Sequence, residues 1–449
     1  MAGVLSLALV ALMVATVPSL TSCTKNTEPA DITDLLSKVP SSAEAVVGLN
    51  LRSMLEKAGC EVDGSKITPG EDLEQWIDGH SEFVPNQREV MKMVLSGESG
   101  VDPLGAVFFI DAYNTYLSAM IADTSKFEEF VKKQTGKTFE DNDGVKICGN
   151  IAMAGAQMWM ALGSGSTVDA KAIKNYMQLT ESQSFMENPF AEHIATMKRD
   201  IVGWGLTRAF MGKGMSIGDA ATVTMATGML FEDASALGFN IDFQEGQLES
   251  EIEVLNDKGD NAKYLLPAEK LDTDDIKGLA TNAEAVVAVS VPNELIKKIE
   301  KVSSSLGGNS LGFLLRMIGC LDGTLAVATG DLDNPEKSLS GLITTDGKPS
   351  SDFMTLLSQF GNTQKDDKIV RVKSGTVGGG LEVEKAADYL KGATLGGVVN
   401  ANASDLGGNK EGIKSFSFRV SPKSGSLIIN VTVAGVNEKE NMLMTLLKN

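Results

Sequence analysis

The sequence predicts an α+β protein built from two similar tandem domains, and two observations lead to this fold class. The first is a repeated pentapeptide, Ala-Glu-Ala-Val-Val, which occupies residues 43–47 and again residues 283–287. Each copy opens a run of alternating, β-branched residues that is typical of a strand. The second observation is that the same order of later elements follows both copies. Self-similarity of this kind indicates an internal duplication of one structural unit.

The first half contains strand and helix patterns in a definite order. A helix near 52–58 follows the first strand at 43–51. We then expect two strands, a helix and two further strands at 106–110, 116–121, 125–133, 145–153 and 157–162. An alternating hairpin over 237–255, with its turn at Gly246, closes this half.

The second half repeats that order. A helix near 293–302 follows the strand at 283–291, and later elements are expected at 324–328, 338–344, 351–360, 368–373 and 380–383. A hairpin over 416–433 turns at Gly425. The order strand–helix–strand–strand–helix–strand matches a split βαβ, ferredoxin-like unit enlarged by extra strands. Each half is therefore expected to form a sheet-and-helix layer that ends in a hairpin.

The spacing of the repeated segments sets the expected domain boundaries. The pentapeptides are 240 positions apart, but the hairpin glycines Gly246 and Gly425 are only 179 apart, so the first half is longer by 61 residues. The additional residues fall within 60–100 and within a Met-rich, helical-looking stretch between 168 and 230. We predict a first domain over 32–265 that carries a Met-rich helical insertion, and a second domain over 275–449.

The charge balance excludes some classes of partner. Among 449 residues there are 40 Lys and Arg against 59 Asp and Glu, which gives a formal net charge of −19. Binding to nucleic acid or to an anionic membrane surface requires clustered basic residues, so neither is expected. The only two histidines, His80 and His193, argue against most zinc sites and against a histidine-based catalytic triad.

The N-terminus has the features of a secretory leader. Residues 4–17 are apolar and uncharged, which is too short for a membrane-spanning helix but fits the core of a signal peptide. Residues 20–23, Leu-Thr-Ser-Cys, resemble a bacterial lipobox, although no Lys or Arg precedes the apolar run. The resemblance implies cleavage before Cys23, diacylglycerol on its sulfur and a further acyl chain such as palmitate on its amino group. We therefore predict a signal peptide over 1–22 and a polar tether over 23–31; a buried N-terminal helix is the alternative.

The opening of the mature chain resembles a known group of lipoproteins. A lipobox, a short tether and then residues 35–47, with the pattern Val-Pro-x-x-Ala-x-x-Val-Val, are similar to uncharacterised lipoproteins of Bacteroidetes, which carry a domain of unknown function over nearly the whole chain. The resemblance implies an outer-membrane lipoprotein of the cell envelope. We expect it to face the periplasm rather than the cell surface, because the tether lacks the dense Asp/Glu cluster that marks surface export in some Bacteroidetes lipoproteins. It implies no catalytic residues.

No motif in the sequence points to a catalytic or metal site. Residues 163–166, Gly-Ser-Gly-Ser, fit a turn and lack the spacing of a Gly-x-Ser-x-Gly elbow. Residues 141–144 resemble part of a calcium loop, but the first and last carboxylates are missing, so a hairpin turn is favoured. Cys60, Cys148 and Cys320 are widely spaced, allow at most one disulfide and are expected to be buried thiols. We predict no catalytic residues, no metal and no cofactor.

Methionine is concentrated in one stretch. Ten of the 20 methionines lie between 150 and 230, together with two of the three tryptophans. Methionine in such numbers either patches a core or lines a surface that adapts to apolar partners. The candidate ligand or partner surface comprises Met158, Trp159, Met160, Met197, Trp204 and Met225.

These observations favour a non-enzymatic role. The first hypothesis is a lipid-anchored binding or scaffolding module of the cell envelope, whose partner is an unknown protein or a small apolar ligand. A hydrolase with a carboxylate-based site in a cleft is the second hypothesis, because 59 acidic residues could supply a convergent pair. A chaperone for apolar cargo is the third.

Overall fold

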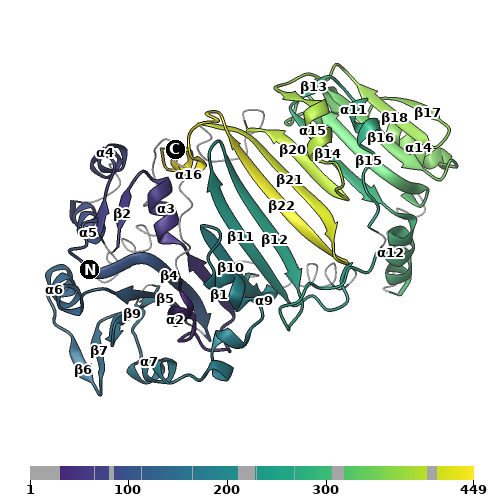
Figure 1. Cartoon of the computed structure of the whole chain (residues 1–449). Helices are drawn as coiled ribbons and strands as arrows, with labels where there is room; N and C mark the ends of the chain where they lie inside the picture. The colour runs from purple at the N-terminus through teal and green to yellow at the C-terminus, as the bar shows by residue number, and fades with distance from the viewer. Residues whose placement is uncertain are drawn as a thin grey trace.

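The computed structural model describes residues 31–448, except for 65, 80–84, 113, 164, 211–227, 229, 267, 306–317 and 402–411. The predicted α+β class is confirmed: one large antiparallel sheet of 18 strands dominates the molecule, and helices pack on it (Figure 1). The expected signal peptide, the lipobox cysteine Cys23 and the tether up to residue 30 lie outside the described residues.

In the first half, β1 (Ala45–Leu49) lies between β4 (Val101–Asp111) and β10 (Ile201–Leu206). Beyond β4 the sheet continues through β5 (Asn114–Ile121), β9 (Gln157–Leu162), β8 (Ile151–Ala154), β7 (Val145–Cys148) and β6 (Glu140–Asn142). Beyond β10 it continues through β11 (Ala236–Gln244) and β12 (Gln247–Leu255).

In the second half, β14 (Ala285–Val291) lies between β15 (Leu321–Thr329) and β20 (Leu395–Asn400). On one side follow β16 (Leu339–Thr345), β18 (Ile369–Ser374) and β17 (Asn362–Asp366). On the other side follow β21 (Ile413–Lys423) and β22 (Ser426–Gly435).

The two halves meet edge to edge. Residues Gln247 to Glu253 of β12 pair antiparallel with Ala434 to Ile428 of β22. The teal hairpin β11–β12 and the yellow hairpin β21–β22 therefore form one continuous stretch of sheet in Figure 1. The predicted terminal hairpins are both present, and they are what joins the halves.

Helices cover both faces of the sheet at its two ends. In the first half, one face carries α3 (Leu51–Lys57), α4 (Glu71–Gly79), α5 (Pro85–Leu95) and α6 (Thr124–Thr135), and the other carries α2 (Thr33–Leu36), α7 (Ala170–Met177) and α8 (Ala191–Ala195). In the second half, α14 (Ser351–Ser358) covers one face, and α11 (Thr273–Lys277) and α15 (Val383–Tyr389) cover the other. Two further helices are α12 (Asn293–Ser305) and the C-terminal α16 (Met442–Lys448).

Local sequence explains why these helices form where they do. In α6, the carboxylate of Asp123 accepts hydrogen bonds from the Ser125 and Lys126 backbone N–H groups, and Gly136 ends the helix with φ of 72°. Phe127 and Phe130 are spaced to face the same side and are buried against the sheet. An N-cap carboxylate, an apolar stripe and a left-handed glycine together define this helix.

Three details of the prediction are wrong. A split βαβ unit places another strand between the two strands it connects, whereas β1 and β4 are direct antiparallel neighbours, so the ferredoxin-like order does not apply. The expected strand at 380–383 contributes only the short β19 (Leu381–Glu382), and the chain then turns into helix α15. The strand expected at 145–153 is two strands, β7 and β8, joined by a turn.

Two inner strands of the large sheet were not predicted. β10 and β20 each supply an inner strand of the sheet, next to β1 and β14 respectively. Both are rich in glycine, with the sequences IVGWGL and LGGVVN. Glycine weakens the strand pattern, because it adds no side chain to the alternation on which the prediction depends. None of the helices in the described part of the chain is long and apolar enough to cross a membrane.

Candidate functional site

The four central strands, β11, β12, β22 and β21, have opposite chemistry on their two faces. Residues that pair directly across strands share a face, and the face alternates along each strand. One face, which we call the apolar face, is apolar at every position except Ser250; it carries Leu237, Phe239, Ile241, Phe243, Leu248, Ile252, Val254, Leu427, Ile429, Val431, Val433, Phe416, Phe418, Val420 and Pro422. The opposite, polar face carries Asn240, Asp242, Gln244, Gln247, Glu249, Glu251, Glu253, Asn430, Thr432, Ser415, Ser417, Arg419 and Ser421.

Both ends of the apolar face are packed by other parts of the chain. At one end Phe231 and Ala262 pack with Val254 and Leu427. At the other end Met442 of α16 packs with Leu248, Phe416 and Val433, and Leu443 joins the cluster that holds Phe243. The covered ends show that this face is built to be buried.

Between the covered ends, two rows of side chains are half-buried, and their outermost members, Ile241 and Val420, pack against the clusters that cover the ends. One row runs Ile241–Ser250–Val431–Phe418 across the strands, and the next runs Phe239–Ile252–Ile429–Val420. We call these eight residues the apolar strip. A contiguous row of apolar side chains is a better candidate for an interaction site than single scattered ones.

The strip continues into the second half through direct register partners. Phe418 pairs with Gly397, Gly397 with Val287, and Val287 with Val327. Val287 lies on β14, an inner strand of the sheet, yet the residue is 43% exposed. Val47 holds the corresponding place in the first half, between Phe108 and Gly203, and packs against the first-half core.

Two aromatic rings in the strip lie over glycines of the neighbouring strands. A Cβ atom added to Gly203 would lie 2.3 Å from Cζ of Phe239, and one added to Gly397 would lie 3.1 Å from Cε1 of Phe418. The glycines are needed here for close approach of a ring, because both are in strand conformation without positive φ. The rings fill the space that the glycines leave and make the strip continuous.

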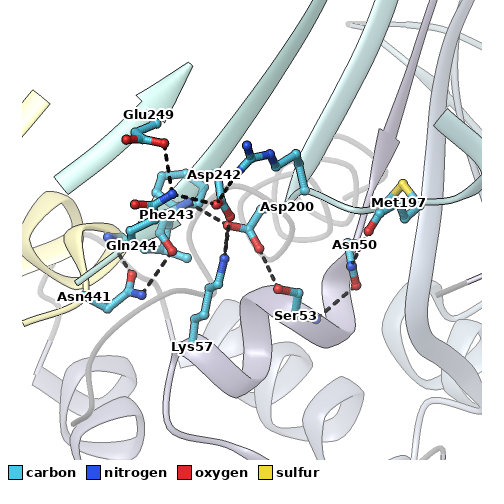
Figure 2. A network of polar contacts seen from close by, with 12 residues as sticks. Asn50, Ser53, Lys57, Met197, Asp200, Asp242, Phe243, Gln244, Glu249 and Asn441 are labelled. Carbon is cyan, nitrogen blue, oxygen red and sulfur yellow. Dashed lines mark hydrogen bonds and ion pairs between the residues drawn. The ribbon is translucent and has the colours of Figure 1, made fainter. Parts of the chain in front are cut away.

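An ionic cluster lies at the start of β10, beside the first-half end of the sheet (Figure 2). The carboxylate of Asp200 is fully buried and accepts hydrogen bonds from Ser53 Oγ, Lys57 Nζ and the Phe243 backbone N–H, each at 2.7 Å. Lys57 Nζ also donates to Asp242 Oδ1 at 2.7 Å. A lysine at the end of α3 therefore bridges two carboxylates on adjacent strands.

Their surroundings shift the pKa values of the two carboxylates in opposite directions. Burial raises the pKa of Asp200, against the opposing influence of the Lys57 ammonium and the other donors. Burial also acts on Asp242, but hydrogen bonds from Lys57, Gln244 and Arg199 outweigh it and hold the pKa of Asp242 below its usual range. Arg199 Nη1 lies 2.7 Å from Asp242 Oδ2 and Gln244 Nε2 lies 3.0 Å from it. Every carboxylate oxygen of the pair already accepts a hydrogen bond from the protein, so the cluster has the geometry of a structural clamp.

The clamp is extended by backbone contacts. Asn50 accepts a hydrogen bond from the Ser53 N–H, as the N-cap of α3, and its amide donates to the carbonyl oxygen of Met197 at 3.0 Å. On the other side, the Asn441 amide donates to the carbonyl oxygen of Phe243 at 3.2 Å, just before α16 begins. Figure 2 shows these contacts linking α3, β10, β11 and the C-terminal segment.

The predicted Met-rich surface is placed in the core. Met158, Trp159 and Met160 are at most 1% exposed, and Met197 and Trp204 are at most 5% exposed. Met158 and Met160 face one core of the first half while Trp159 faces the other, because successive residues of β9 point to opposite faces and both are covered. These five residues therefore form no exposed surface. Met225 lies outside the described residues.

The predicted turn at 141–144 and the predicted buried thiols are both present. Gly144 N–H donates to Asp141 Oδ1 at 2.8 Å in a turn between β6 and β7, as expected for a hairpin rather than a calcium loop. Cys60, Cys148 and Cys320 are buried free thiols, and burial raises the pKa of Cys60 to about 12, so its thiolate is disfavoured. In the part of the chain that the structure describes, no group of three or more His, Cys, Asp or Glu side chains could hold a metal ion.

The residues of the apolar strip and of the ionic cluster were not singled out by the sequence. The strip was visible only as the alternation that predicted the two hairpins, and nothing in that alternation reports which face stays uncovered. The cluster is assembled from Lys57, Asp200 and Asp242, which are far apart in the chain and belong to no spacing motif.

Comparison with known proteins adds no family. No family model matches this chain, and no curated protein matches it. Among solved structures, crystal form III of TP0453 is 8% identical, covers 81% of this chain and 97% of that chain, and has a TM-score of 0.29; crystal form I gives 7% identity, the same coverage and a TM-score of 0.26. Crystal form IV covers 48% of this chain and 78% of that chain at 10% identity and a TM-score of 0.29. Scores this low carry no argument about the function of this chain.

Proposed function

We propose that the protein is a non-enzymatic binding module of the cell envelope, held to the membrane by lipid on Cys23, that binds an apolar ligand or partner through the apolar strip. The observation that carries this proposal is the pair of half-buried apolar rows between two covered ends of the same face. Burial of apolar side chains stabilises a complex by about 25 cal/mol for each Å² removed from water, so contact along the whole strip would favour binding of an occupant.

A tandem duplication is part of the proposal, because the two halves share their hydrogen bonds in detail. The Glu44 N–H donates to the Ile110 carbonyl, and the Leu206 N–H donates to the Glu44 carbonyl. Around the second pentapeptide, the Glu284 N–H donates to the Thr329 carbonyl, and the Asn400 N–H donates to the Glu284 carbonyl. Each half then supplies an equal share of the strip, with Phe239 and Phe418 in corresponding places 179 positions apart.

The strip is best tested with an uncharged, environment-sensitive dye such as Nile red, added to the mature full-length protein. Ile252→Lys places a charge in the centre of the strip and should reduce dye binding about tenfold, because a buried ammonium must be desolvated. Thr432→Lys, on the polar face of β22, is the matched control and should leave binding unchanged. Circular dichroism should show that both variants remain folded. Equal dye binding by the wild type and the folded Ile252→Lys variant would rule out the strip as the binding surface.

The lipid anchor is tested separately. Cys23→Ala should move the protein from the membrane fraction to the soluble or unprocessed pool, because covalent acyl chains would be its hold on the bilayer. If the variant stays with membranes after a high-salt wash, the anchoring part of the proposal fails while the strip is unaffected. An outer-membrane location is proposed from the lipobox and the resemblance, and a periplasm-facing one from the tether, which lacks a dense Asp/Glu cluster.

A carrier of apolar cargo would use the same strip, and the identity of the occupant separates a carrier from a docking module. A hydrolase is not favoured, since the carboxylate pair with shifted pKa values, Asp200 and Asp242, is engaged by protein donors at every oxygen.

A further inference from the structure

We infer that the occupant of the apolar strip is a single amphipathic helix of another protein, lying across the strands. This inference rests on the proposed function, because it names the partner of the same strip. The reasons are the layer that the strip interrupts, the width of the gap, and the chemistry of its surface.

The layer of helices on this face is present at both ends of the sheet and absent over the strip among the described residues. In the first half, the row that contains Ile252 and Ile429 continues to Leu117 and Met160, which are buried beneath α3, α5 and α6. At the outer end of the second half, the same row continues to Ile343 and Val370, which pack with α14. A helix on the strip would therefore complete a layer that this chain already builds on both sides.

The gap has the width of one helix. The two covered rows on β11 are those of Leu237 and Phe243, six residues apart, which corresponds to about 20 Å along an antiparallel strand. A single α-helix with its side chains has a diameter of about 10–12 Å, so two helices side by side would need about 20–24 Å. At most one helix therefore fits between the covered rows.

The C-terminal helix α16 is an example of a helix that packs on this face. Met442, Leu443 and Met444 are at most 4% exposed, and they pack at the edge of the same apolar face, next to the strip. The strip is thus continuous with an interface in which a short helix buries methionine and leucine side chains against these strands. The partner helix extends that interface to the next two rows.

The charges define the two sides of the partner helix. The strip has no charged side chain, and the hydroxyl of Ser250 is its one polar group, so the buried stripe of the partner is uncharged. The protein carries a net charge of −19, which favours lysine or arginine on the outer side of the helix through long-range attraction. From β11 to Val287 on β14 the strip and its continuation span five strand spacings, or about 24 Å, which is the length of about 16 helical residues.

The test uses a fluorescent 16-residue peptide as the probe. It has leucines at positions i, i+3, i+4 and i+7 and lysine or glutamine elsewhere, and it is compared with a scrambled peptide of the same composition that has no apolar stripe. Fluorescence anisotropy with the full mature protein should show binding of the amphipathic peptide at least tenfold tighter than of the scrambled one. The same tenfold loss is expected in Ile252→Lys, no change in Thr432→Lys, and a smaller loss in Val287→Lys.

Each alternative result contradicts a defined part of the argument. If a fluorescent hexadecanoyl probe binds the strip and is lost in Ile252→Lys while the helical peptide does not bind, the helix is wrong and the proposed apolar-binding function stands. If sedimentation shows a dimer of the protein that Ile252→Lys dissociates, the occupant is a second copy and the inference fails. If neither probe distinguishes wild type from Ile252→Lys, both the inference and the proposed function fail.

Discussion

The two halves of the sheet share their strand order and differ in what lies on them. In the first half, Val47 sits between Phe108 and Gly203, and residues of the 60–100 segment add α4 and α5 above the same face. In the second half, Val327 replaces Phe108 beside Val287, and Val287 is 43% exposed. The difference shows that the apolar pattern of a strand predicts which of its faces can be buried. Whether that face is buried depends on whether other segments of the chain supply a helix to pack on it.

The halves also differ in charge at one corresponding point. The Asn50 N–H donates to the Asp200 carbonyl, and the Ser290 N–H donates to the Thr394 carbonyl in the same place of the second half. Thr394 uses its hydroxyl to donate to the carbonyl oxygen of Val420, where Asp200 uses a carboxylate to join Lys57 and Ser53. The first half therefore holds its inner strands with ion pairs, and the second half holds them with neutral hydrogen bonds.

The largest effect on stability is expected when the ionic cluster is broken. Lys57→Ala removes the cation between two carboxylates and leaves buried Asp200 facing Asp242, which should lower the free energy of unfolding by about 3–5 kcal/mol. Lys423→Ala is the matched control, because Lys423 pairs with Glu251 and Glu253 on the exposed polar face, and its loss should cost less than about 1 kcal/mol. Urea unfolding measures both; similar losses would show that the cluster is no stronger than a surface pair.

A second comparison tests a covered against an uncovered position on the strands that continue the apolar face on either side, β9 and β14. Met160→Ala should cost about 2–5 kcal/mol, because the side chain is 1% exposed and its removal leaves a cavity. Val287→Ala should cost less than about 0.5 kcal/mol, since the residue is already partly in water. Thermal and urea unfolding report these losses. A large loss in Val287→Ala would mean that this position is packed in solution.

A third comparison concerns the two glycines beneath aromatic rings. Gly203→Ala should cost about 2–3 kcal/mol, because its Cβ would lie 2.3 Å from the ring of Phe239 and the ring must move. Gly397→Ala should cost about 1 kcal/mol or less, since its Cβ would lie 3.1 Å from both Cε1 of Phe418 and the carbonyl oxygen of Val286, and shifts of a few tenths of an ångström relieve these contacts. Denaturant midpoints of the two variants give the difference; the reverse order would contradict the packing described for these rings.

The smallest expected effect is a pH dependence. The folded-state pKa of Asp242 is lowered, so its ionised form stabilises the protein above pH of about 4 and that contribution is lost as the pH falls through the folded pKa. The pKa of Asp200 is raised by burial, so its protonation in the folded state adds stability as the pH falls. Between pH 7 and pH 3, Asp242→Asn should therefore lose less stability than the wild type and Asp200→Asn should lose more. Unfolding free energies at the two pH values decide the signs.

The sequence allowed those parts of the fold to be predicted that repeat at short range. The hairpins β11–β12 and β21–β22 follow from strict alternation around Gly246 and Gly425, and helix α6 follows from its cap and apolar spacing. β10 and β20 were missed because their glycines, which make room for Phe239 and Phe418, look like breaks in a strand.

The candidate site could not be predicted in the same way. Met158, Trp159 and Met160 suggested an adaptable surface, but they lie on β9, which helices cover on both faces. The strip became visible only when the pairing of β12 with β22 placed two apolar hairpins side by side. The contacts that assemble a cluster such as Lys57 with Asp200 and Asp242 span more than 140 residues of chain, and single-residue patterns carry no information about them.

The pairing of β12 with β22 has a consequence for self-association of the protein. Without β22, β12 would be an open edge strand, with backbone groups free to pair with the β12 of another molecule. In the antiparallel register centred on Glu251, such self-pairing would set Glu251 opposite Glu251 and Glu249 opposite Glu253, and like charges directly opposite each other repel. In the intact chain these three glutamates face Asn430, Thr432 and Ile428 instead. The row of glutamates therefore favours closure of the sheet within one chain over polymerisation between chains.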